Sequence, residues 1–135
     1  MKVIIIDGQG GKMGRALVEQ ILKQNIPCDL IAIGTNSMAT EAMLKGGATA
    51  AATGENPVVV NAKDADVIAG PMGIITANAL LGEVTPSMAL AISESKALKV
   101  LIPVNRCGIF AAGTEGKTPA QYIESAVSKI AEVCR

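Results

Sequence analysis

Residues 3–15 read VIIIDGQGGKMGR, a short aliphatic run followed by closely spaced glycines. The run Val3–Ile6 predicts a buried strand and the residues from Lys12 onward predict a helix, with a glycine-rich turn between them. Such a turn directs backbone N–H groups and a helix N-terminus at one place, where they can bind a phosphate or pyrophosphate. The stretch therefore predicts a nucleotide-binding α/β protein, although it does not specify a reaction.

The rest of the chain alternates between strand and helix patterns. Further strands are predicted at Asp29–Ile33, Ala48–Ala52, Asp66–Ala69 and Lys99–Val104. Helices are predicted at Lys12–Gln24, Ser37–Lys45 and Pro119–Val133, with two more beginning near residues 56 and 85. Three of these starts place a cap residue before a proline, at Asn56-Pro57, Thr85-Pro86 and Thr118-Pro119. Most strands are aliphatic throughout, which indicates burial on both faces of a parallel sheet. We predict a single domain, residues 1–135, with an α/β, three-layer, doubly wound (Rossmann-like) fold of about five parallel strands, with room for a short edge strand at Ile109–Ala112.

Composition narrows the function classes. Half of the 135 residues are hydrophobic, 18% are charged and the formal net charge is zero, which argues against binding to nucleic acid or to an anionic membrane surface. Phe110 and Tyr122 are the only aromatic residues, so a base-stacking platform is not expected. The apolar run at Val3–Ile6 is too short for a membrane span or a signal peptide, and we expect a cytoplasmic protein.

The apolar content has two interpretations. The chain either buries part of its surface against a second copy, as a homo-oligomer, or fills its own core densely with alanine. There is no histidine, and the three cysteines have no paired spacing, so neither a metal site nor a disulfide framework is expected.

The glycines of the first loop have separate predicted roles. Gly8 permits the tight turn, Gly10 or Gly11 lets a phosphate approach the backbone, and Gly14 lets the helix lie close to the strand. The alternative is that all of them serve only to make a tight turn. A Walker-type loop is disfavoured because Met13 follows Lys12, where a Ser or Thr would be needed for magnesium.

The run from Gly8 to Arg15 resembles the cofactor loop of dihydrodipicolinate reductase. The resemblance implies NAD or NADP at the helix N-terminus, in contact with Gly8, Gly11, Lys12 and Met13. The cofactor site predicted for this loop comprises Gly8, Gln9, Gly10, Gly11, Lys12, Met13 and Gly14.

Two features differ from that pattern. Asp7 places a carboxylate beside the loop, where it would repel a pyrophosphate. The second strand ends in Gly34-Thr35-Asn36 instead of the Asp or Glu that binds an adenosine ribose. Thr35 and Asn36 are therefore the predicted ribose contacts.

Two later turns, Thr53-Gly54 and Gly70-Pro71-Met72-Gly73, resemble the phosphate-binding loops of methylglyoxal synthase-like domains. The resemblance implies a phosphate or substrate site formed by Thr53, Gly54, Gly70, Pro71 and Gly73. The alternative is that Gly70-Pro71 simply ends a strand.

Asn105-Arg106-Cys107 brings together an amide, a cation and a thiol after the last strand. Arg106 is a candidate anion clamp, and Asn105 a candidate ligand contact. Cys107 is either an activated thiol or a small packed hydrophobe. The candidate catalytic residues are Asp7, Arg106 and Cys107.

Several segments spread along the chain resemble a family of short bacterial proteins with a Rossmann-like fold. They include Asp7–Gly11, Gly34–Asn36, Ala52–Asn56, Gly82–Pro86 and Pro103–Cys107. This resemblance implies the fold and no particular activity. Three hypotheses follow: a nucleotide- or NAD(P)-binding protein that serves as an oxidoreductase subunit, a small phosphometabolite enzyme, and a non-catalytic binding or regulatory subunit. The sequence does not decide whether the protein is an enzyme.

Overall fold

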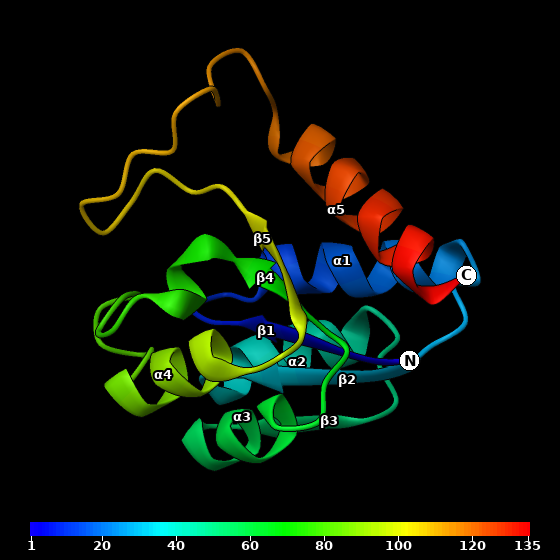
Figure 1. The fold of residues 1–135 in the computed structure, drawn as a ribbon, viewed down its shortest axis with the longest axis horizontal. Coiled ribbons are helices and arrows are strands. Elements are labelled where there is room, and N and C mark those ends of the chain that lie inside the picture. Colours follow the sequence, from blue (N-terminus) through cyan, green and yellow to red (C-terminus); the bar gives the residue numbers. More distant parts are fainter.

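The computed structural model describes residues 1–135 and confirms a three-layer α/β fold. The strands are β1 (Lys2–Asp7), β2 (Asp29–Gly34), β3 (Ala51–Thr53), β4 (Val67–Pro71) and β5 (Leu98–Ile102). They form one parallel sheet in the order β3-β2-β1-β4-β5 (Figure 1). The helices are α1 (Lys12–Lys23), α2 (Ser37–Lys45), α3 (Glu55–Ala62), α4 (Pro86–Glu94) and α5 (Pro119–Cys134), with a short 3₁₀ helix, η1 (Met72–Ile75).

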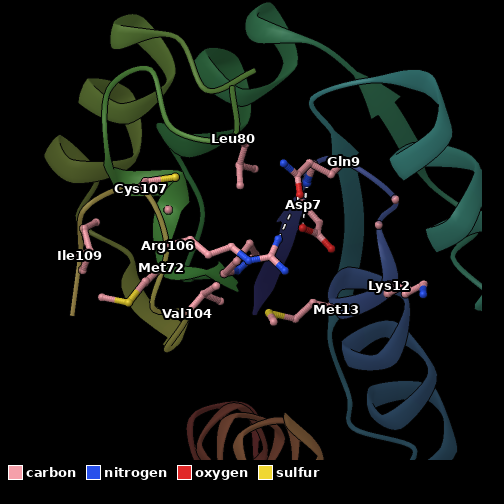
Figure 2. Close-up of a pocket in the computed structure, with 15 residues that line it drawn as sticks. Asp7, Gln9, Lys12, Met13, Met72, Leu80, Val104, Arg106, Cys107 and Ile109 are labelled. Atoms are coloured by element: carbon pink, nitrogen blue, oxygen red, sulfur yellow. Dashed lines mark hydrogen bonds between the residues drawn. The ribbon is translucent and has the colours of Figure 1, made fainter. Parts of the chain in front are cut away.

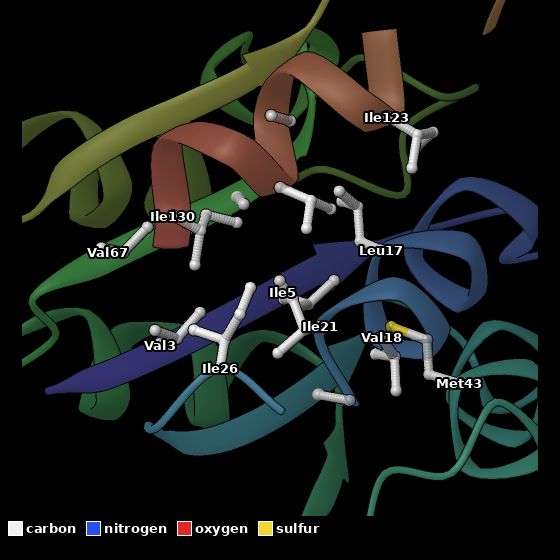
Figure 3. Packing of buried hydrophobic residues seen from close by; sticks show 14 of the residues in the cluster. Val3, Ile5, Leu17, Val18, Ile21, Ile26, Met43, Val67, Ile123 and Ile130 are labelled. Atoms are coloured by element: carbon white, nitrogen blue, oxygen red, sulfur yellow. The ribbon is translucent and has the colours of Figure 1, made fainter. Parts of the chain in front are cut away.

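Alternate residues of β1 enter two cores, because successive side chains of a strand point to opposite faces of the sheet. Val3 and Ile5 pack with α1 and α5 on one face, as Figure 3 shows. Ile4 and Ile6 pack with α3 and α4 on the other face. Since both faces are covered, β1 is buried along nearly its whole length, which explains its uniformly aliphatic sequence.

Two predicted helix starts are confirmed and one is wrong. The side chains of Thr85 and Thr118 accept hydrogen bonds from the third helical N–H of α4 and α5. Helix α3 begins one residue before the predicted cap, at Glu55, because Gly54 makes the turn with a φ of 103°. Pro57 fits within this first turn, where an N–H has no partner inside the helix.

The predicted edge strand at Ile109–Ala112 is wrong. Residues 103–118 form no helix or strand and extend away from the sheet before α5 begins (Figure 1). Turns with positive φ at Cys107, Gly108 and Gly113 interrupt this segment. Asn105 Oδ1 also accepts the Ala111 N–H at 2.8 Å, so the segment bonds to itself and not to β5.

Candidate functional site

A cavity lies where the fold changes direction at the carboxyl edge of the sheet. β1 and β4 are central neighbours, but the chain leaves them toward opposite faces, into α1 and toward α4. Such a switch point is where open α/β sheets bind ligands. The cavity here has a volume of about 310 Å³. Its lining comprises Asp7, Gly8, Gln9, Gly10, Gly11, Lys12, Met13, Pro71, Met72, Gly73, Leu80, Val104, Arg106, Cys107 and Ile109.

The cavity has a peptide wall and an apolar wall. The glycine loop forms the peptide wall, and Met72, Leu80, Val104 and Ile109 lie across from it (Figure 2). Arg106 reaches between the two walls, and its Nη1 donates to Gln9 Oε1 at 3.4 Å. Arg106 takes part in none of the four salt bridges of the structure, so its charge remains available to an anion.

Asp7 joins the end of β1 to the start of α1. Its Oδ1 accepts the Gly8 N–H at 2.8 Å, and its Oδ2 accepts the Gly14 N–H at 2.7 Å. The residue is only 5% exposed. Burial raises the pKa of the Asp7 carboxyl above its ordinary value, and the hydrogen bonds from Gly14 and Gly8 offset this only in part. The carboxylate that looked misplaced beside a phosphate loop thus has both oxygens occupied within the turn.

Three of the four loop glycines are required by the packing of the protein itself. A Cβ at Gly8 would lie 2.6 Å from Thr35 Oγ1, and one at Gly14 would lie 2.8 Å from Asp7 Cβ. Gly11 has a φ of 70°, and a Cβ there would meet the backbone of Ala39 in α2 at 2.7 Å. Gly10 differs, because it is exposed, and a Cβ added to it would have no neighbour within 4 Å.

Few N–H groups of the loop remain for a ligand. Those of Gly8 and Gly14 donate to Asp7, and that of Gly11 donates to Gly8 O at 2.9 Å. The N–H groups of Gly10 and Lys12 have no acceptor within the protein. The Lys12 side chain points away from Arg106 in Figure 2, so Lys12 contributes to the wall through its backbone.

The N–H of Gln9 is taken by Glu83, a residue that the sequence did not single out as functional. Glu83 Oε1 accepts hydrogen bonds from Gln9 N at 2.9 Å, Thr35 Oγ1 at 2.7 Å and Asn36 Nδ2 at 2.6 Å. Partial burial alone would raise the pKa of the Glu83 carboxyl, but these three donors hold it below its ordinary value. Glu83 is therefore a fixed carboxylate between the glycine loop and the end of β2.

Thr35 and Asn36, the predicted ribose contacts, lie beside the glycine loop but outside the cavity lining. Asn36 also caps α2, because its Oδ1 accepts the Ala39 N–H at 2.8 Å. Both side chains thus already have partners in the protein, and Glu83 is the group that they orient.

Some of the remaining predicted site residues line the cavity, and others lie outside its lining. Cys107 is exposed and lines the cavity, whereas Asn105 only stabilises the segment after β5. Pro71 and Gly73 line the cavity, and Gly70 lies behind them, where a Cβ would collide with the carbonyl oxygen of Ile6.

Thr53 and Gly54 lie elsewhere, at the edge strand β3, where Thr53 Oγ1 is 2.7 Å from Thr40 Oγ1. Strands β2 and β1 separate them from Gly70 and Gly73 in β4 and η1. The two turns singled out for a phosphate site therefore do not meet in one cavity.

Fold and cavity together define the class of the protein, a Rossmann-like α/β domain with a pocket at its switch point. The chain belongs to the family described as a domain of unknown function, DUF3842, whose model matches residues 2–135. Comparisons with curated proteins and with solved structures found no match. No helix has the length and apolar character needed to span a membrane, and no three His, Cys, Asp or Glu side chains are grouped so that they could hold a metal ion.

The apolar wall and Glu83 are the parts of the site that the sequence did not reveal. Met72, Leu80, Val104 and Ile109 are ordinary hydrophobic residues from three different segments of the chain. Glu83 lies 48 residues beyond Thr35, its hydrogen-bond partner. The only local signal was the neighbouring Gly82, whose positive φ allows the turn that precedes Glu83.

Proposed function

We propose that this protein binds a nucleotide, NAD(H) or NADP(H) being the leading candidates, with its phosphates at the glycine loop. The observation that carries this proposal is the cavity at the switch point between β1 and β4. Exposed Gly10, with the open N–H groups of Gly10 and Lys12, offers a phosphate a close approach to the backbone at the start of α1. Arg106 supplies a cation that forms no salt bridge within the protein.

The size of the cavity limits how a dinucleotide fits. Ligand sites measure about 300–1,000 Å³, so a cavity of about 310 Å³ suits one part of such a molecule. The apolar wall suits a planar ring such as nicotinamide. The remainder would extend over Gly10 toward the end of β2. When bound, the cofactor would supply hydride transfer. The hypothesis that the protein is an oxidoreductase subunit would also require a second subunit to complete the substrate site.

Thermal unfolding with and without NAD(H), NADP(H) and ATP tests the proposal. A ligand at a hundred times its Kd stabilises the folded state by about 2.7 kcal/mol, which corresponds to a rise in Tm of roughly 10 °C for a domain of this size. Gly10→Ala should remove the shift without unfolding the protein, because the added Cβ contacts nothing within 4 Å. Arg106→Gln should weaken it, whereas Arg15→Gln, which changes the net charge equally outside the cavity, should not. If none of these nucleotides moves the Tm of the wild type, the proposal fails.

A second candidate, a binding or regulatory protein without catalysis, is favoured by Asp7. Asp7 is the only carboxylate that lines the cavity, and both of its oxygens already accept backbone N–H groups. Any metabolite turnover that depends on Asp7, Arg106 or Cys107 would exclude this candidate. The phosphometabolite hypothesis has less support, because strands β2 and β1 lie between Thr53-Gly54 and the turn that holds Gly70 and Gly73.

A further inference from the structure

The end of β2 lacks an acidic residue of its own, but the fold brings one there from a distant segment. In dinucleotide-binding folds, a carboxylate at the end of the second strand accepts hydrogen bonds from the adenosine ribose hydroxyls. Here β2 ends at Gly34 and is followed by Thr35 and Asn36. Glu83, from the connection between η1 and α4, hydrogen-bonds to both of those side chains.

The Glu83 carboxylate has one occupied oxygen and one open oxygen. All three of its hydrogen bonds, from Gln9 N, Thr35 Oγ1 and Asn36 Nδ2, go to Oε1. Oε2 has no hydrogen-bond partner in the protein, and Glu83 forms no salt bridge. Three donors on one oxygen fix the orientation of the carboxylate, and the second oxygen is left as an acceptor for an incoming hydroxyl.

The carboxylate also lies at the correct loop. It accepts the N–H of Gln9, which stands between Gly8 and Gly10, and a Cβ at Gly8 would come within 3.0 Å of Glu83 Oε1. A nucleotide whose phosphates lie over Gly10 would therefore carry its ribose past this acid.

We propose that Glu83 is the ribose-binding acid of this site and makes it prefer a nucleotide with a free 2′-hydroxyl, such as NAD(H), to the 2′-phosphorylated NADP(H). The inference rests on the proposed nucleotide-binding function. A ribose hydroxyl would donate to Oε2, whereas a 2′-phosphate would face an unpaired negative charge. A like-charge contact of this kind lowers affinity roughly tenfold or more.

Titration of the protein with NADH and with NADPH, followed by the fluorescence of the nucleotide, tests the assignment. The wild type should bind NADH roughly tenfold or more tighter than NADPH. Glu83→Gln keeps an oxygen that can accept from Gln9, Thr35 and Asn36 but removes the charge. It should lower the affinity for NADH roughly tenfold and remove the preference. Glu55→Gln is the control and should leave the preference unchanged. Glu55 is a carboxylate of α3 that accepts a hydrogen bond from Thr85, near Glu83 in the sequence but outside the proposed ribose contact.

A second variant tests the assignment in case Glu83→Gln does not fold. Thr35→Val removes one of the three donors that position the carboxylate, so it should reduce the preference for NADH without abolishing it. The Tm of each variant shows whether the fold is intact.

Three results would overturn the assignment: equal affinities of the wild type for the two nucleotides, an unchanged ratio in Glu83→Gln, or tighter binding of both by Glu83→Gln. The last would show that Glu83 competes with the ligand for the Gln9 N–H. Binding with an unchanged ratio refutes this inference alone. If the wild type binds neither nucleotide, the proposed function and this inference fail together.

Discussion

Replacement of Asp7 by alanine would test whether this carboxylate holds the glycine loop together. Its two oxygens accept the N–H groups of Gly8 and Gly14, and all three residues are buried. Alanine leaves both N–H groups without an acceptor. Each buried N–H that loses its partner costs about 1–3 kcal/mol, so Asp7→Ala should lower the free energy of unfolding by roughly 2–6 kcal/mol. That is a large share of the roughly 5–15 kcal/mol that stabilises a typical domain.

Urea unfolding at neutral pH, followed by far-UV circular dichroism, measures this loss. Circular dichroism is preferable to fluorescence because the chain has no tryptophan and one tyrosine. Asp64→Ala is the matched control. Asp64 is an exposed carboxylate whose salt bridge to Lys2 lies on the surface, so its removal should change stability by less than about 1 kcal/mol.

A loss below about 1 kcal/mol in Asp7→Ala would refute the reasoning, since it would mean that the two N–H groups find other acceptors. A variant that kept its stability but lost turnover of a substrate would instead place Asp7 in catalysis, as the sequence alone suggested. Loss of stability with ligand binding retained is the result expected here.

Three further predictions concern Asp7, the loop glycines and the cysteines. Burial raises the pKa of the Asp7 carboxyl, so the folded state binds the carboxyl proton more tightly than the unfolded state does. The resulting contribution to stability is present at low pH and is lost as the pH rises from about 4 through the folded pKa. Asp7→Ala should remove this part of the pH dependence of the free energy of unfolding. Gly14→Ala should cost about 1–3 kcal/mol in urea unfolding, because its Cβ would lie 2.8 Å from Asp7 Cβ, whereas Gly10→Ala should change stability by less than about 0.5 kcal/mol. Iodoacetamide followed by mass spectrometry should label exposed Cys107 well before Cys28, whose pKa is raised by burial and by the adjacent Cys134 thiol; equal labelling rates would contradict this arrangement.

The architecture was predictable because the central strands β1 and β4 are buried on both faces. A strand such as β1, covered by helices on each side, must be aliphatic throughout, and this pattern can be read from Val3–Ile6 without any knowledge of the partners. Likewise, the pairs Thr85-Pro86 and Thr118-Pro119 determine the starts of α4 and α5 through local cap hydrogen bonds. Segments without such local determinants were less predictable. Ile109–Ala112 is apolar enough for a strand, but the turns around it keep it from pairing with β5.

The glycine loop was recognised, but the reasons for its glycines were not predictable. The tight contacts at Gly8, Gly11 and Gly14 involve Thr35, Ala39 and Asp7, two of which belong to later parts of the chain. The role of Asp7 depends on hydrogen bonds from two backbone N–H groups, which residue identity does not reveal. The role of Glu83 depends on one backbone N–H and on the side chains of Thr35 and Asn36, which are distant in the sequence. A sequence shows that carboxylates are present, but it does not show which N–H each one will accept.

The two carboxylates limit what the loop can offer a ligand. Asp7 and Glu83 take the N–H groups of Gly8, Gln9 and Gly14, and that of Gly11 donates to Gly8 O. The Met13 N–H also faces the Asp7 carboxylate, so those of Gly10 and Lys12 remain for a ligand. A ligand that depended on many backbone contacts to its phosphates would bind poorly to so few donors. We therefore expect the affinity to come mainly from Arg106 and from the apolar wall, with the loop supplying only the position of the phosphate. On this reasoning Arg106→Gln should weaken binding at low salt far more than at high salt, because a partly exposed ionic contact is screened. An affinity that did not depend on salt would place most of the binding energy elsewhere in the cavity.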